Sequence, residues 1–438
     1  MKKTLVLIAG ALLVSGQVSA KDLIVRLHET SDIKALTTFG ATETIISDLN
    51  VHKISTLSPM DIEFVKKEFK RNSNIKWVQE DHPVSERSTL PNDPNFAAQW
   101  SLNNDDDTDI NAPEAWDYGV GGKDGNGSDI VLAIVDGGVD ASHQSLSENM
   151  WTNTEEIADN GIDDDGNGYV DDVGGWNAYR NNSEVGGSRH GTHVAGIAAA
   201  RGDDGLQVTG VNWDAKIMNI KGSSGTTSIV LRAYGYILKQ KQIWLESGGE
   251  RGANVVVTNS SFGVDYANCE SGSYPAWNDI YNEMGEAGIL SAAATINNSI
   301  NVDERGDVPT GCSSPYIVAV TNTTVDGEKY NRAGYGFNSI DLGAPGTDVL
   351  STLPGNSTGT LTGTSMATPH VAGAVGFLHS VAPRGFLELY ETHPGEAALA
   401  LKQILLETVT PQEDLREVTQ SGGRLNLHAA TERMINNF

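Results

Sequence analysis

The chain has 438 residues, of which 39% are hydrophobic and 20% charged, and its formal net charge is −27. This apolar content allows a large buried core and excludes an intrinsically disordered chain. The charge is uneven, because residues 1–90 carry 12 basic and 11 acidic side chains whereas the remainder carries 18 and 46. Such an acidic body repels phosphate backbones, so we expect no nucleic-acid partner and an affinity for cations.

The N-terminus has the pattern of a secretory signal peptide. Two lysines at positions 2 and 3 precede an apolar run over 5–14, and VSA at 18–20 supplies the small residues of a cleavage site. We therefore expect a signal peptide at 1–20 and a secreted protein, extracellular or periplasmic. A short core helix is the alternative. No apolar run reaches the roughly 18 residues of a membrane span, so we expect no membrane-spanning segment.

Residues 21–88 have the pattern of a small α+β module. Its predicted strands lie at 22–27, 44–47, 51–55 and 75–78, and its predicted helices at 32–39 and from Ser58 to Phe69. The resulting order, β-α-β-β-α-β, is that of a split βαβ sandwich. A polar stretch with Pro83, Ser85, Ser88 and Pro91 follows, which is typical of a linker that proteases cut.

Residues 89–438 alternate between apolar strands and helical stretches. The predicted strands lie at 130–135, 216–220, 255–257, 289–294 and 316–320, and the predicted helices include 192–200 and 228–247. This alternation indicates an α/β fold with a doubly wound, mostly parallel sheet. Ligands of such folds bind beyond the carboxyl ends of the strands, so polar residues at those ends are the first functional candidates.

Three polar side chains occupy positions of this kind. Asp136 directly follows the strand at 130–135, His190 opens a helical stretch, and Ser365 lies where a helix of small residues begins. Taken singly, each is more commonly a turn, capping or core residue. Together they indicate nucleophilic catalysis, because a serine needs a neighbouring base and that base needs an orienting carboxylate. The free N–H groups of a helix start also favour an oxyanion.

The residues around these three side chains resemble a known family. The stretches AIVDGGVDASH (133–143), HGTHVAG (190–196) and GTSMATPHVAG (363–373) closely resemble the three signatures of the subtilisin-like serine proteases, in the same order along the chain. The resemblance implies a serine endopeptidase with Ser365 as nucleophile, His190 as general acid–base and Asp136 as the group that orients the imidazole. His193 would be structural.

The resemblance extends over nearly the whole chain and implies a proenzyme. Residues 21–88 would be a propeptide that assists folding and acts as an intramolecular inhibitor until autocatalytic removal. Residues 89–438 would be the subtilisin-like peptidase domain, a monomer that acts on protein and peptide substrates.

Two further segments are similar to parts of this family. ILSAAATIN (289–297) resembles the strand that ends in the oxyanion-hole asparagine, which places that role on Asn297, although Ile296 stands where the family usually has glycine. A surface-loop asparagine is the alternative. VTNSSFG (257–263) resembles the strand that pairs with the substrate backbone. The primary specificity pocket would then be bordered by Ser261, Phe262 and Gly263.

The cleavage preference does not follow from the sequence. Three acidic residues, Asp303, Glu304 and Asp307, lie in a segment that precedes a predicted strand. They would favour basic substrate side chains only if they face the specificity pocket.

The stretch NGIDDDGNGYVDD at 160–172 has the spacing of a calcium-binding loop. Its predicted ligands are Asp163, Asp165, Asn167, the carbonyl of Tyr169, and Asp171. Oxygen ligands favour Ca²⁺ over zinc. Gly174 stands where an EF-hand has its final glutamate, so this loop is not a complete EF-hand, and a solvated acidic loop is the alternative.

The chain has two cysteines, Cys269 and Cys312. In an oxidising compartment we expect them to form one disulfide that closes a loop of about 43 residues. Two free thiols are the alternative.

Two other functional classes remain open at this point. GTSMA at 363–367 is close to the G-x-S-x-G elbow of lipases and esterases, but those enzymes place acid and base after the serine, and only about 70 residues follow Ser365 here. A calcium-bound adhesin or an inactive protease is the non-enzymatic alternative, and Ile296 is the feature that favours it.

Overall fold

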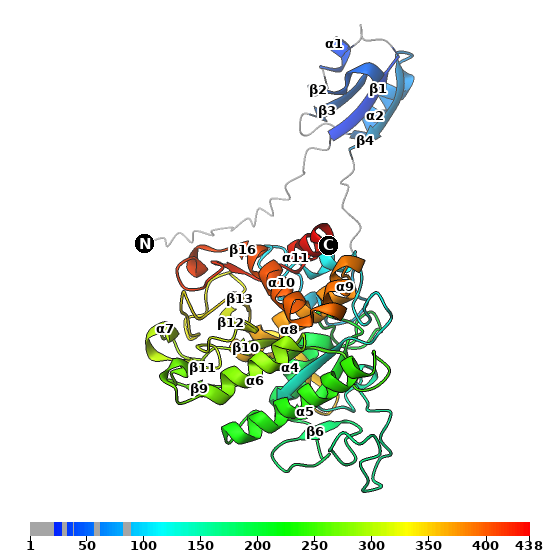
Figure 1. The fold of residues 1–438 in the computed structure, drawn as a ribbon. Coiled ribbons are helices and arrows are strands. Elements are labelled where there is room, and N and C mark those ends of the chain that lie inside the picture. The colour runs from blue at the N-terminus through cyan, green and yellow to red at the C-terminus, as the bar shows by residue number, and fades with distance from the viewer. Residues whose placement is uncertain (1–21, 29–32, 38, 57–61, 82–88) are drawn as a thin grey trace, which may run out of the picture. The chain divides into compact units, whose positions relative to one another are not determined.

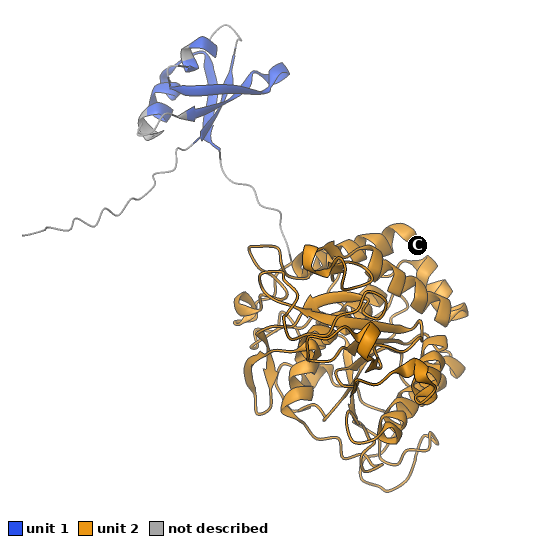
Figure 2. Ribbon diagram, turned by 90° about the vertical axis from the view of Figure 1, so that its left-hand side faces the viewer, with its two compact units in different colours: residues 1–87 blue, residues 88–438 orange. Residues whose placement is uncertain are grey.

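The computed structural model describes residues 22–28, 33–37, 39–56, 62–81 and 89–438 (Figure 1). The chain divides into two compact units, Met1–Arg87 and Ser88–Phe438 (Figure 2). The expected signal peptide at 1–20, the helix start at Ser58 and most of the expected linker lie outside the described residues.

The first unit is a four-stranded antiparallel sheet in the order β2-β3-β1-β4. Its elements are β1 (Asp22–Leu27), α1 (Ile33–Leu36), β2 (Gly40–Ile46), η2 (Ser47–Leu49), β3 (Val51–Thr56), α2 (Ile62–Arg71) and β4 (Ile75–Glu80). Alternate residues of β1 point into a small core that also contains Val65 and Phe69. The β-α-β-β-α-β order agrees with the sequence prediction. β2 begins four residues earlier than predicted, because it is mostly exposed and its pairing with β3 leaves no apolar pattern.

The second unit is built on a nine-stranded sheet in the order β16-β17-β13-β12-β10-β8-β5-β7-β6. The strands are β5 (Val131–Asp136), β6 (Gly175–Asn177), β7 (Lys216–Lys221), β8 (Val255–Ser260), β10 (Leu290–Ala294), β12 (Ile317–Thr323), β13 (Leu342–Pro345), β16 (Thr410–Pro411) and β17 (Gly423–Arg424). Neighbouring strands are parallel except for β16 and β17. The predicted mostly parallel α/β sheet is therefore confirmed.

Helices cover both faces of this sheet (Figure 1). Side chains of β5 alternate between two cores, with Leu132 and Ile134 on one face and Val131, Ala133 and Val135 on the other. The first core is completed by α4 (Arg189–Ala199) and α8 (Thr364–Ser380), and the second by α5 (Thr227–Glu246) and α6 (Pro275–Glu286). Burial on both faces explains why β5 reads as a continuous apolar run.

The remaining elements connect and cover this framework. They are η3 (Phe96–Ala98), α3 (Ala112–Trp116), η4 (Ser147–Asn149), β9 (Val264–Asp265), η5 (Cys269–Ser271), α7 (Val302–Arg305), β11 (Asp307–Val308), β14 (Val349–Leu353), β15 (Ser357–Leu361), α9 (Arg384–Thr392), α10 (Pro394–Glu407), η6 (Glu413–Leu415) and α11 (Leu427–Asn437). The short strands β9 and β11 pair antiparallel, as do β14 and β15. Among the described helices, none is long and apolar enough to cross a membrane.

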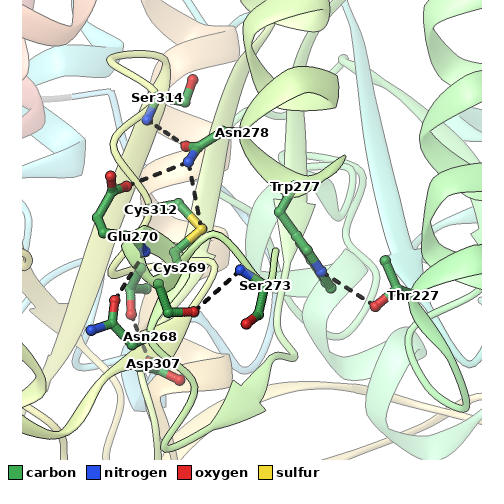
Figure 3. The surroundings of a disulfide bond; sticks show 12 residues. Thr227, Asn268, Cys269, Glu270, Ser273, Trp277, Asn278, Asp307, Cys312 and Ser314 are labelled. Atoms are coloured by element: carbon green, nitrogen blue, oxygen red, sulfur yellow. Dashed lines mark hydrogen bonds between the residues drawn. A yellow bond between two sulfur atoms is a disulfide. The ribbon is translucent and has the colours of Figure 1, made fainter. Parts of the chain in front are cut away.

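Cys269 and Cys312 are joined in a disulfide with a Cα–Cα distance of 5.0 Å (Figure 3). Cys269 follows β9 and Cys312 follows β11, so the bond ties together the two segments that form this small antiparallel pair. The side-chain amide of Asn278, on α6, lies 3.6 Å from the sulfur of Cys269. The structure thus contains the disulfide that the cysteine count led us to expect, and not two free thiols.

Candidate active site

Asp136 is the last residue of β5 and is almost completely buried, with 2% of its surface exposed. The N–H of Gly137 donates to Asp136 Oδ1 at 2.6 Å. The next residue, Gly138, has a φ of 102°, and a Cβ there would stand 1.9 Å from the carbonyl oxygen of Gly186. Glycine at 138 is therefore required for the tight turn that leaves Asp136 at the end of the strand.

His190 lies in the first turn of α4. Ser188 caps this helix, because its hydroxyl accepts from the N–H of Gly191 at 2.9 Å and donates to the carbonyl of Gly138 at 3.1 Å. A Cβ on Gly191 would stand 2.4 Å from that same carbonyl oxygen and 3.0 Å from Asp136 Cβ. The absence of a side chain at 191 lets the helix approach β5 closely, and His190 Nδ1 reaches Asp136 Oδ2 at 2.8 Å.

The electrostatics of this pair set the protonation of the imidazole. Burial lowers the pKa of His190, but the hydrogen bond and the negative charge of Asp136 raise it by more, so the pKa lies above its usual 6.5. An Nδ1–H held by the carboxylate leaves Nε2 as the proton acceptor. His193 contrasts with it, because burial lowers its pKa to about 4 and its Nε2 donates to the carbonyl of Gly359 at 3.0 Å.

Ser365 is the second residue of α8, a buried helix that packs against the central strands β8, β10 and β12 of the sheet. Its Oγ donates to the carbonyl of Ser261 at 3.3 Å, and the Ser261 hydroxyl donates to the carbonyl of Ser365 at 3.1 Å. The preceding residue, Thr364, donates its hydroxyl to the carbonyl of Thr295 at 2.6 Å. These bonds fix the start of α8 between the ends of β8 and β10. Helix α8 also packs against α4, which carries His190.

Asn297 lies beside the start of α8 and is solvent-exposed. Its Oδ1 accepts from the backbone N–H of Thr364 at 2.9 Å and from the Thr364 hydroxyl at 3.2 Å. The helix start therefore holds the oxygen end of this amide, and the Nδ2 end remains as a donor. Asn297 and Ser365 line the same cavity of about 420 Å³.

Ile296, the residue that departs from the family pattern, is accommodated without left-handed backbone. Its side chain is 6% exposed and packs in the core. Its carbonyl accepts from the N–H of Gly334 at 2.9 Å, and a Cβ on Gly334 would stand 2.9 Å from Ile296 Cγ2. A glycine opposite Ile296 thus provides the space that the larger residue needs.

The cavity beside Ser365 lies where β8 and β10 end. It is lined by the three predicted pocket residues Ser261, Phe262 and Gly263, and also by Asp265, Tyr266, Asp307 and Arg332. Sequence reasoning did not find Asp265, Tyr266 and Arg332, because β9, which ends at Asp265, has only two residues and the other two lie outside regular elements, so no periodicity marks them.

Of the three acidic residues in segment 303–307, one lines the cavity and the other two bond to neighbouring residues outside it. Asp307 lines the cavity. The carboxylate of Asp303 instead accepts from the N–H groups of Asn338 and Ser339 at 3.0 and 2.9 Å. Glu304 accepts from the side chain of Asn301 at 3.2 Å.

The acidic loop also brings carboxylates together, but not in the predicted set. Oxygens of Glu156, Asp165 and Asp172 all lie within 4.8 Å of one another, and Glu156 and Asp172 are buried. The side-chain amide of Asn167 donates to Asp165 and to Asp172, each at 3.0 Å. The amide of Asn153 likewise bridges Asp165 and Asp172, at 2.9 and 3.0 Å.

The other predicted ligands have different contacts in this loop. Asp163 accepts from the N–H groups of Asn167 and Gly168, and Asp171 accepts from those of Asn160 and Gly161. The ring of Tyr169 packs edge-on against those of Trp176 and Tyr236. Glu156 and Asp172 were missed, although Asp172 ends the acidic stretch that the sequence singled out.

Taken together, the sheet and the site define a class of protein: a mostly parallel α/β fold in which a buried aspartate, a half-exposed histidine and a helix-start serine lie at the carboxyl edge of the sheet. The model of the subtilase family (Peptidase_S8) matches residues 127–426. The chain belongs to the subtilase family.

Relatives with curated names are proteases. An extracellular protease of Xanthomonas campestris pv. campestris is 30% identical over 75% of this chain and 56% of its own length. Thermitase of Thermoactinomyces vulgaris is 30% identical over 66% of this chain and 85% of its own length. The chain spans 56% of the Xanthomonas protease, 47% of subtilisin-like protease 1 of Plasmodium vivax and 30% of the cell wall-associated protease of Bacillus subtilis, so these relatives are longer proteins.

Solved structures support the fold. A protease from Pseudoalteromonas arctica PAMC 21717 is 26% identical with a TM-score of 0.55, covering 79% of this chain and all of that chain. The epidermin leader peptide processing serine protease of Staphylococcus aureus has a TM-score of 0.56 at 19% identity, covering 95% of this chain and 99% of that chain.

Proposed function

We propose that this chain is a serine endopeptidase that hydrolyses peptide bonds through Ser365, His190 and Asp136. The observation that carries the proposal is the 2.8 Å contact between His190 Nδ1 and the buried Asp136, on a helix packed against the one that Ser365 opens. Such a pair prepares the imidazole as a base. The protease names of the relatives agree with this activity. The order Asp, His, Ser along the chain argues against a lipase or esterase.

The proposed mechanism is acyl transfer. Ser365 Oγ turns from the Ser261 carbonyl to attack the peptide carbonyl carbon while His190 Nε2 takes its proton. Asp136 stabilises the imidazolium that forms. Asn297 Nδ2 and the N–H of Ser365 hold the oxyanion. His190 then protonates the leaving amine, and a water molecule, activated by the same imidazole, hydrolyses the ester on Ser365.

A labelling experiment tests this function directly. The purified full chain, allowed to mature in calcium-containing buffer, should hydrolyse casein. A fluorophosphonate probe should abolish the hydrolysis and add its mass to the peptide that contains Ser365. A chain that shows neither casein hydrolysis nor labelling between pH 6 and 9 would be an inactive protease, and the proposal would be wrong.

Replacing Asn297 with alanine should lower kcat by about 10²–10³-fold and change KM little. The physical reason is that the amide would donate to the oxyanion, which exists only in the transition state and the intermediate. Steady-state kinetics on one peptide substrate measure both constants. Asn338→Ala, which removes an exposed amide bonded to Asp303, is the matched control and should leave kcat unchanged. An equal loss in both variants would remove Asn297 from the oxyanion hole.

We also propose that the chain is made as a secreted proenzyme. Residues 1–20 would be the signal peptide, 21–88 the inhibitory propeptide, and 89–438 the monomeric mature enzyme, extracellular or periplasmic. The separate compact unit that ends at Arg87 is suited to autocatalytic removal, and the name of one relative, an extracellular protease, agrees with secretion.

The acidic cluster fits calcium by the chemistry of its donors. We propose that Glu156, Asp165 and Asp172 hold Ca²⁺, with Asn167 beside them. Three carboxylates within 4.8 Å repel one another, and two of them are buried, so a divalent cation would offset a large electrostatic cost. The predicted ligands Asp163 and Asp171 and the Tyr169 carbonyl would complete or shape the loop.

Calcium should therefore raise the melting temperature. A calcium concentration 100 times the Kd adds about 2.7 kcal/mol to the free energy of unfolding, which corresponds to a shift of about 5 °C. Differential scanning calorimetry of Ser365→Ala, which avoids autolysis, with calcium and with EDTA measures the shift. Asp172→Asn should abolish it, and Glu250→Gln, an exposed control, should not. A calcium shift that survives in Asp172→Asn would place the ion elsewhere.

A further inference from the structure

We propose that the cavity beside Ser365 accepts a basic side chain, and that Asp307 selects peptides with lysine or arginine on the acyl side of the scissile bond. This inference rests on the proposed protease function and names its substrate class.

The orientation of Asp307 is fixed from one side. Its Oδ2 accepts three hydrogen bonds, from the hydroxyls of Thr295 and Thr310 at 3.0 and 2.6 Å and from the N–H of Ile296 at 3.0 Å. The side chain is 1% exposed, so these donors hold it in a single position. All three bonds are made by Oδ2, and Oδ1 lies beside Gly263, another residue that lines the cavity.

The absence of a side chain at Gly263 leaves Asp307 Oδ1 accessible from the cavity. Oδ1 of Asp307 lies 3.6 Å from the point where a Cβ on residue 263 would stand, and the carbonyl oxygen of Val308 lies 2.4 Å from it. Any side chain at 263 would fill the space in front of the carboxylate. Because Ser365 and Asn297 line the same cavity, the substrate side chain that enters it belongs to the residue whose carbonyl is attacked.

Charge favours a cation as the occupant. Burial raises the pKa of Asp307 to about 6, so the carboxylate is ionised at neutral and alkaline pH. A buried carboxylate without a countercharge is costly, and a substrate ammonium or guanidinium would supply that charge. Asp265, opposite Asp307 in the β9–β11 pair, and Arg332 also line the cavity. Both side chains are exposed, so solvent and salt screen their opposite charges, and the buried Asp307 sets the charge of the pocket.

The pocket walls are held in place by covalent and aromatic contacts. The disulfide links the segment after Tyr266 to the segment after Asp307 (Figure 3). The hydroxyl of Tyr266 accepts from Asn298 at 2.8 Å, and the Arg305 guanidinium lies 5.7 Å from the centre of its ring. A fixed aromatic wall suits the methylene stem of a long basic side chain.

Matched peptide substrates test the selectivity. Tripeptide p-nitroanilides that differ only in the residue before the cleaved bond, lysine, arginine, methionine or phenylalanine, are compared at pH 8 by kcat/KM. We expect lysine and arginine to exceed methionine by at least tenfold. In Asp307→Asn, which keeps the shape and a hydrogen-bonding group, we expect the advantage of the basic substrates to fall by on the order of 10²-fold. The methionine substrate, which has no charge to pair with Asp307, should lose much less, so the ratio of the two kcat/KM values is the readout.

A binding measurement on a catalytically inactive variant tests the cation pocket independently of the proposed catalysis. Benzamidine, a small aromatic cation, is titrated by calorimetry into Ser365→Ala, so no turnover is needed. Because this variant cannot process itself, its linker is first cut by limited proteolysis with an added protease and residues 21–88 are removed, in this and in the following variant. Binding should be lost in the double variant Ser365→Ala, Asp307→Asn. Glu304→Gln, an exposed carboxylate bonded to Asn301, is the control and should leave both selectivity and benzamidine binding unchanged.

Each result has a defined meaning. A chain that binds benzamidine through Asp307 but cleaves no peptide would contradict the protease and keep the cation pocket. A chain that cleaves methionine or phenylalanine peptides as well as lysine peptides would overturn the inference and keep the protease. A folded Asp307→Asn variant with an unchanged preference would also overturn it, and its melting temperature shows whether it is folded.

Discussion

Replacing Ser365 with alanine is expected to reduce casein hydrolysis by about 10⁶-fold, a magnitude known from subtilisin, a member of this family. The variant keeps the oxyanion donors and substrate contacts, which leave a residual acceleration of about 10³–10⁴ over water. The loss is this large because His190 and Asp136 have no function in acyl transfer without the hydroxyl. The variant should also accumulate as the full-length proenzyme on denaturing gels, since autocatalytic removal of 21–88 needs the same nucleophile.

Ser380→Ala is the matched control for this prediction. It removes a hydroxyl from the last residue of the same helix, where the side chain donates to the carbonyl of Phe377 at 2.6 Å, away from the cavity that Ser365 lines. Its activity and processing should equal those of the wild type. If Ser365→Ala retains more than about a thousandth of the activity, Ser365 is not the nucleophile.

Replacing Asp136 with asparagine is expected to lower kcat by about 10⁴-fold. The carboxylate accepts from His190 Nδ1 at 2.8 Å and thereby keeps Nε2 free to take the serine proton. An amide at 136 can donate to Nδ1 and hold the other tautomer, in which Nε2 carries the proton. KM should change little, because Asp136 is buried and does not line the substrate cavity.

The pH dependence gives a second readout of the same change. Neutral His190 is the base, so activity rises as pH increases through its pKa. In the wild type, Asp136 holds this pKa above 6.5, and the rise in kcat/KM should be centred above that value. In Asp136→Asn only the lowering effect of burial remains, so the residual activity should rise at a lower pH. Asp129→Asn, an exposed carboxylate near the start of β5, should leave both rate and profile unchanged. An unshifted midpoint in Asp136→Asn would contradict the role of the carboxylate.

Much of the framework follows from local pattern. The six apolar residues before Asp136 predict a strand buried on both faces, and β5 has that environment. The edge strands β6 and β16 could not be predicted, because segments of three and two residues are too short to show a hydrophobic period. The extent of β2 was also missed, since backbone pairing and not burial defines it.

The site was predicted only in part, for geometric reasons. The motifs identify Asp136, His190 and Ser365. No spacing rule predicts how closely α4 packs against β5, because that distance depends on residue 191 being a glycine. The sequence likewise could not show that Asp307, and not Asp303 or Glu304, lines the cavity, because this depends on the pairing of β11 with β9.

The acidic loop illustrates the limit of spacing rules most clearly. The alternation of Asp163, Asp165 and Asn167 suggested ligands in a continuous series. In the structure, Glu156 enters the cluster because its carboxylate accepts the N–H groups of Asp164, Asp165 and Asp171, which draws an upstream residue into the loop. A local spacing rule contains no information about such a contact.

The position of the disulfide has a consequence for the lifetime of the enzyme. A protease that reaches high concentration is exposed to its own activity, and cuts occur in exposed irregular segments. The segment between Cys269 and Cys312 contains Asn297 and Asp307, and stretches of it, such as 297–299 and 303–305, are exposed. A single cut anywhere between the two cysteines leaves both pieces covalently joined, so the strand that carries the oxyanion donor cannot leave the nicked molecule.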